Sequence, residues 1–73
     1  MKNQQKKKLR LYAYVVYQVE EKVIAIRLKP TDAIRDVLSA LPKNTLRWME
    51  LEEPNKIAAI DTFTRYRGLA QKI

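Results

Sequence analysis

The side chains that carry most enzyme chemistry are scarce in this sequence. It has no histidine and no cysteine, and Ser39 is its single serine. Without these groups there is no ordinary serine or cysteine triad and no nitrogen or sulfur ligand for zinc. The single glycine, Gly68, rules out a phosphate-cradling loop or a dinucleotide fingerprint. We therefore expect no catalytic residue, no cofactor and no small-molecule substrate.

Carboxylates are the remaining candidates for chemistry. Asp32 and Asp36 stand four residues apart, a spacing that places both on one face of a helix, and Glu50, Glu52 and Glu53 form a second group. Either group could hold magnesium for phosphodiester chemistry. Solvated acids on a helix face or in a turn explain both groups more simply. We expect no metal site, and we interpret the chain as a non-enzyme.

The positive charge is concentrated at the N-terminus. The chain has a net charge of +7, and residues 1–10 contribute five cations and no acid. These cations are Lys2, Lys6, Lys7, Lys8 and Arg10. The pattern predicts a flexible basic arm over residues 1–8 and one folded domain over residues 9–73. Such arms bind phosphate backbones or acidic surfaces, although a solubilising tail is the simpler reading.

Two strands follow the arm. Residues 9–19 and 23–29 both alternate with the two-residue period of a β-strand. A tight turn at Glu20 and Glu21 would pair residues whose numbers sum to 41, so that every apolar side chain on one face meets an apolar partner. Glu-Glu is a poor dipeptide for a two-residue turn, and a four-residue loop would keep the same pairing.

The other face of this hairpin combines aromatic rings with cations. It carries Arg10, Tyr12, Tyr14, Arg27 and Lys29. If helices cover only the opposite side of the sheet, this face is open and forms a stacking platform for nucleic acid. The simpler reading is that the tyrosines make cross-strand cation-π pairs or are buried in a dimer.

The middle of the chain predicts a helix. Pro30 ends the second strand, Thr31 can cap a helix, and apolar residues recur with helical spacing up to Leu41, where Pro42 ends it. Residues 45–52 predict a third strand.

The last third allows two readings. Residues 57–63 could return as a strand after a turn at Pro54, with a final helix from about Thr64 to the C-terminus; or one long helix could occupy the whole segment. Residues 51–60 weakly repeat the sequence of residues 19–26, and this repeat favours a strand over residues 57–63. The preferred order is therefore ββαββα rather than ββαβ followed by one long helix. The predicted fold is a small two-layer α+β domain, an antiparallel sheet with helices on one face.

These features favour a small basic protein that binds DNA or RNA by charge and stacking, with little sequence choice. The predicted binding residues are Lys6, Lys7, Lys8, Arg10, Tyr12, Tyr14, Arg27, Lys29, Arg65 and Arg67. The alternative is a protein-interaction module, a homodimeric adaptor or small inhibitor, that uses the tyrosine face or Trp48 with the acidic residues 50–53; Trp48 itself is expected in the core. No apolar run approaches the length of a membrane span, and we expect a cytoplasmic protein with no membrane partner.

Overall fold

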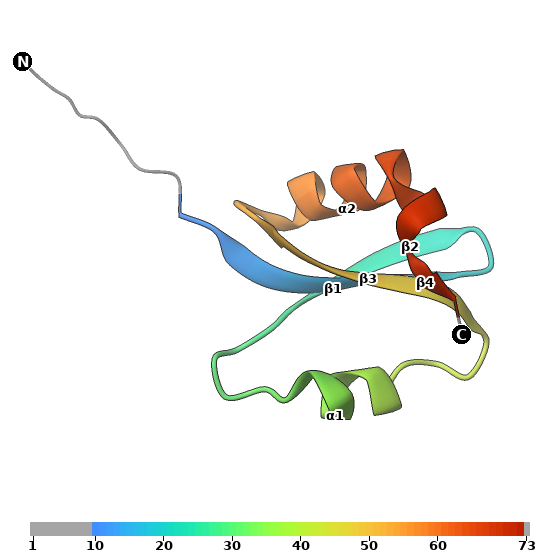
Figure 1. Ribbon diagram of the computed structural model, residues 1–73, viewed down its shortest axis with the longest axis horizontal. Coiled ribbons are helices and arrows are strands. Elements are labelled where there is room, and N and C mark those ends of the chain that lie inside the picture. Colours follow the sequence, from blue (N-terminus) through green and yellow to red (C-terminus); the bar gives the residue numbers. More distant parts are fainter. Residues whose placement is uncertain (1–9, 73) are drawn as a thin grey trace, which may run out of the picture.

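The computed structural model describes residues 10–72, which form one antiparallel sheet and two α-helices (Figure 1). The strands are β1 (Tyr12–Val19), β2 (Lys22–Arg27), β3 (Thr45–Glu53) and β4 (Gln71–Lys72), and they lie in the order β2-β1-β3-β4. The predicted α+β class is confirmed. Strand β1 is central, and β2 forms one edge of the sheet.

The hairpin of β1 and β2 has the predicted register. Tyr14 lies opposite Arg27, and Tyr17 lies opposite Ile24. Val19 pairs with Lys22, so the turn contains only Glu20 and Glu21 and is the shorter of the two loops considered. Glu20 adopts a left-handed backbone with φ of 56°, the conformation that a two-residue hairpin turn demands at its first position.

Helix α1 (Ile34–Ser39) is shorter than predicted and begins later. Its N-cap is Ala33, which offers no side-chain hydrogen bond, so the predicted Thr31 cap is wrong. A tight turn takes up these residues instead. The Asp32 amide donates to the Lys29 carbonyl at 2.9 Å, and the Lys29 amide donates to the Asp32 carboxylate at 2.8 Å. This turn follows the hairpin's second strand, and the helix cap comes two residues later than predicted, at Ala33 instead of Thr31.

Strand β3 confirms the predicted third strand and contains a bulge near its start. Gln18 lies opposite Arg47 and Val19 lies opposite Thr45, so Leu46 is an extra residue on β3. An unpaired bulge residue is free to turn out of the ladder. Leu46 is accordingly 52% exposed.

Residues 57–63 belong to helix α2 (Lys56–Arg65). The strand that the weak internal repeat predicted for them is therefore wrong. The Asn55 side chain accepts the Ala58 amide at 2.8 Å and caps the helix. The helical spacing of Ala59 and Phe63 places both against the sheet, where they are fully buried. Pro54 therefore precedes a helix start, as in the alternative reading.

The C-terminal segment is not the predicted final helix. α2 ends at Arg65, a 3₁₀ turn η1 (Arg67–Leu69) follows, and β4 pairs with the start of β3. Gly68 lies in η1, where no atom lies within 4 Å of a β-carbon built on it. Close approach of another backbone therefore does not explain this glycine.

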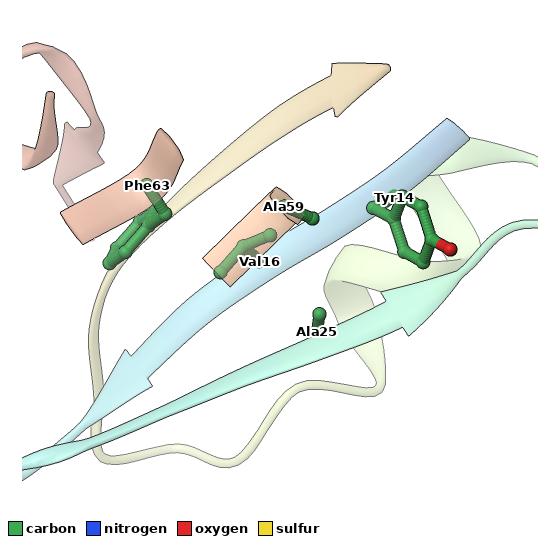
Figure 2. Packing of buried hydrophobic residues seen from close by; sticks show 5 residues of the cluster. All are labelled: Tyr14, Val16, Ala25, Ala59 and Phe63. Atoms are coloured by element: carbon green, nitrogen blue, oxygen red, sulfur yellow. The ribbon is translucent and has the colours of Figure 1, made fainter. Parts of the chain in front are cut away.

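The two helices lie on opposite sides of the sheet (Figure 1), and the prediction of helices on one face is wrong. Helix α2 packs on the face that carries Tyr14 and Val16, and Figure 2 shows these side chains together with Ala25 against Ala59 and Phe63. Val15, on the opposite face, is also fully buried. Because β1 is apolar on both faces, both require cover. No helix within residues 10–72 is long and apolar enough to cross a membrane.

Candidate functional site

The predicted open tyrosine face is covered by α2. Tyr14 is only 4% exposed and belongs to the main core cluster with Phe63 (Figure 2). A ring enclosed in the core cannot stack on a nucleobase, so the binding role predicted for Tyr14 is wrong. The cover comes from the chain's own helix, so Tyr14 does not need a second copy to bury it either.

Tyr12 lies at the margin of this core and is half-buried. The Arg27 guanidinium carbon stands 3.7 Å from the centre of its ring. Arg27 is opposite Tyr14 in the ladder, so it reaches Tyr12 on the diagonal, as long side chains can. This cation-π contact orients the exposed guanidinium and covers one side of the Tyr12 ring.

An open hollow of about 410 Å³ lies between the end of β2 and the start of β1. We call it the cationic groove. It is lined by Arg10, Leu11, Tyr12, Ala13, Arg27, Leu28, Lys29 and Pro30. A second hollow is lined by Arg27, Leu28, Lys29 and Pro30, so these four residues border both. The groove thus brings together four predicted binding residues: Arg10, Tyr12, Arg27 and Lys29.

The charged residues that line the groove are all cations. No acidic residue lines it, and the one ion pair recorded among residues 10–72 joins Arg65 to Asp61 at 2.9 Å, on α2. Arg10, Arg27 and Lys29 are all exposed. Three carboxylates belong to neighbouring positions: Asp32, whose Oδ2 accepts the Lys29 amide, and Glu52 and Glu53 of β3, which lie opposite Ala13 and Tyr12. Three solvated cations around an apolar floor can attract a group that is both anionic and planar.

Arg65 and Arg67 do not extend this groove, contrary to the prediction. The Arg67 carbonyl accepts a hydrogen bond from Arg47 Nη1 at 3.0 Å, and Arg47 lies opposite Gln18, near the far end of β1 from Tyr12. Arg65 is already paired with Asp61. The sheet therefore separates Arg67 from the groove by most of its length, and neither Arg65 nor Arg67 lines the groove.

The remaining predicted residues have other positions. Lys6, Lys7 and Lys8 lie outside the described residues. Trp48 lies opposite Tyr17 and is half-buried, so it is not part of the fully buried core in which it was expected.

The structure also shows where the serine and the acidic side chains considered for catalysis lie. Ser39 Oγ donates to the Arg35 carbonyl at 2.9 Å within α1. Glu50 and Glu52 are exposed on β3. Within residues 10–72, no three acidic side chains come close enough to hold a metal ion.

Sequence reasoning missed the apolar floor of the groove. Leu28 and Pro30 line it because the turn between Lys29 and Asp32 folds the chain back at the end of β2. The available signal was the sequence Lys-Pro-Thr-Asp at residues 29–32. Proline at the second position of a turn, with aspartate able to accept a backbone amide, is typical of a turn and not of a helix cap.

Comparisons of the chain with models of known protein families, with curated proteins and with solved structures find no match. The cationic groove therefore has to be interpreted from its own residues.

Proposed function

We propose that the protein binds nucleic acid through the cationic groove, with little sequence specificity. The observation that carries this proposal is the grouping of Arg10, Arg27 and Lys29 around one hollow that no acidic side chain lines. Lys and Arg side chains that contact phosphates release counterions from the nucleic acid, and this release supplies sequence-independent affinity.

Arg27 is the centre of the proposed site. Tyr12 lies against one side of its guanidinium and Arg27 is exposed, so in this proposal a nucleobase stacks on the other side. Guanidinium planes stack on unpaired bases, so Arg27 takes the role that the two tyrosines were expected to share. Arg10 and Lys29 then hold the flanking phosphates. This arrangement suits single strands, whose bases are free to turn into the groove.

The arm adds long-range attraction in this proposal. Lys6, Lys7 and Lys8 stand two to four residues before Arg10 in the sequence, and Arg10 lines the groove. The proposal includes no catalytic role and no small-molecule substrate. A cytoplasmic location is consistent with it and remains a prediction.

The test is fluorescence anisotropy of labelled single-stranded and duplex oligonucleotides at several salt concentrations. We expect Arg27→Gln to weaken single-strand binding by about 1 to 3 kcal/mol, the value of one stacked base. Lys29→Gln should reduce the slope of log affinity against log salt by about 0.7, the value of one phosphate contact on a single strand. Deletion of residues 1–8 should reduce the slope further.

Lys43→Gln is the matched control. Lys43 is also exposed but lies just before β3, whose first residue Thr45 pairs at the Val19 end of β1. It carries the same charge at the opposite end of the sheet and should leave the affinity nearly unchanged. Equal losses from Lys43→Gln and Lys29→Gln would show that net charge alone causes binding. Negligible binding at low salt would refute the function and favour a protein partner.

A further inference from the structure

The outer edge of β2 has unused hydrogen-bonding groups. The Leu28 amide donates to the Ala13 carbonyl at 2.8 Å, so even-numbered residues of this strand direct their backbone groups toward β1. Val23, Ala25 and Arg27 therefore direct theirs away from the sheet, where no strand of residues 10–72 pairs with β2. Ala25 is 6% exposed as a whole residue, and its side chain packs in the core cluster beneath α2.

This edge also lacks the usual protection against pairing. Proteins protect edge strands with proline, bulges or charges in the middle of the strand. β2 has the sequence KVIAIR, with charges at its ends and four apolar residues between them. Ile24 is 38% exposed although it lies on the sheet face that carries the buried Val15. An edge with these properties favours the addition of another strand.

We propose that two copies of the chain associate by antiparallel pairing of their β2 strands, with Ala25 opposite Ala25 at the two-fold axis. This register fits the outward-directed groups, because residues 23, 25 and 27 become the hydrogen-bonded positions. It places Ile24 of each copy opposite Ile26 of the other, on one face. It also places Glu21 opposite Lys29, so opposite charges meet at both ends of the pairing.

A register shifted by two residues is less favourable. With Ile24 opposite Ile24, each Ile26 would face Lys22 of the other copy and the two mutual Ile24–Ile26 pairs would be lost. The Ala25-centred register therefore combines two aliphatic pairs with two opposite-charge pairs, each of which stabilises neighbouring strands. The dimer does not depend on nucleic-acid binding. Lys29 is shared by both, whereas Arg10 and the stacked Arg27 keep their places in each groove.

The oligomeric state is measured first, by sedimentation equilibrium of the full chain from low to high micromolar concentration. We expect the mass to rise toward twice the monomer mass of 8.6 kDa. Ile24→Lys adds a charge in the middle of the edge and should restore the monomer mass. Ile57→Lys is the control, since Ile57 is 80% exposed on α2 and the variant should dimerise as before. A wild-type chain that stays at the monomer mass would refute the dimer.

Cysteine cross-linking tests the register, because the chain has no cysteine of its own. Opposed residues at non-hydrogen-bonded positions have Cα atoms about 4.5 Å apart, which a disulfide can span. We expect Ile24→Cys and Ile26→Cys proteins to cross-link when mixed and oxidised, and neither to cross-link alone, since identical residues would be about 8 Å apart. Cross-linking of Ile24→Cys alone would refute the Ala25-centred register. No cross-link in any mixture would refute pairing at this edge.

Discussion

Tyr12 and Tyr14 are two residues apart on one strand and share one face, yet they serve different purposes. Tyr14 is enclosed by α2, whereas Tyr12 lies near the end of the sheet, where Arg27 stacks on it. The alternation of side chains assigns both rings to the same face. The alternation does not indicate which elements cover that face along its length. One tyrosine is therefore a core residue and the other supports a cation.

Glu20 is the one described residue other than glycine with positive φ. A left-handed backbone costs an L-residue roughly 1 to 2 kcal/mol, and a glycine at this position avoids that cost. The greater flexibility of glycine in the unfolded chain offsets part of the resulting gain in stability. We expect Glu20→Gly to raise the free energy of unfolding by about 0.5 to 1 kcal/mol. Urea denaturation followed by Trp48 fluorescence measures the change.

Glu21 provides the control for this substitution. It occupies the second position of the same turn, and its φ is not positive. Glu21→Gly relieves no strain and only adds freedom to the unfolded chain, so it should lower stability by up to about 1 kcal/mol. Equal effects of the two substitutions would contradict the assignment of strain to Glu20.

At the scale of elements, the start of α2 depends on one side chain. Asn55 Oδ1 accepts the Ala58 amide at 2.8 Å. Substitution of an asparagine cap by alanine costs helices roughly 1 kcal/mol. We therefore expect Asn55→Ala to lower the free energy of unfolding by about 1 kcal/mol. Asn55→Asp keeps a capping oxygen and should lose much less stability. Urea denaturation monitored by far-ultraviolet circular dichroism provides the measurement.

Asn44→Ala is the comparison, because Asn44 is exposed in the turn before β3 and caps no helix. Its effect should stay within about 0.5 kcal/mol, the range of ordinary surface substitutions. If Asn44→Ala were as costly as Asn55→Ala, the loss at Asn55 would not come from the cap.

The elements differ in how well the sequence predicts them. The β1–β2 hairpin is fixed by local information, because one register pairs every apolar residue across a short turn, and that register is correct. The segment of residues 57–63 is ambiguous, because its apolar residues satisfy both a strand and a helix pattern. The asparagine cap and the burial of Phe63 decide in favour of the helix, and only the cap is visible in the sequence.

At the scale of the whole molecule, the error about the open face has a clear cause. Residues 14–17 of β1 are all buried, a continuous apolar run that is typical of a strand covered on both faces. The sequence contains this run, but the alternation of the longer segment obscures it. Because α2 covers the tyrosines, the candidate site moves to the end of the sheet, where predicted residues Arg10, Tyr12, Arg27 and Lys29 remain together.

The position of the cations is also a property of the whole molecule. Arg10, Arg27 and Lys29 meet because β1 begins where β2 ends, whereas Arg47 and Arg67 meet at the opposite end of the sheet. The hairpin register predicts the first group, whereas the predicted binding residue Arg67 lies beside Arg47 instead. The antiparallel path of the chain, which places the end of α2 beside the start of β3, accounts for the separation.

The most direct test of a binding site in the cationic groove locates a bound nucleic acid on the folded protein. Uniformly ¹⁵N-labelled protein would be titrated with a short single-stranded oligonucleotide at low salt and followed by amide chemical shifts. Binding in the cationic groove should give the largest changes at Arg10, Arg27 and Lys29, with Lys43 and Gln71 at the other end of the sheet unaffected. Changes concentrated around Arg47 and Arg67, or spread evenly over all cations, would contradict a binding site in the cationic groove.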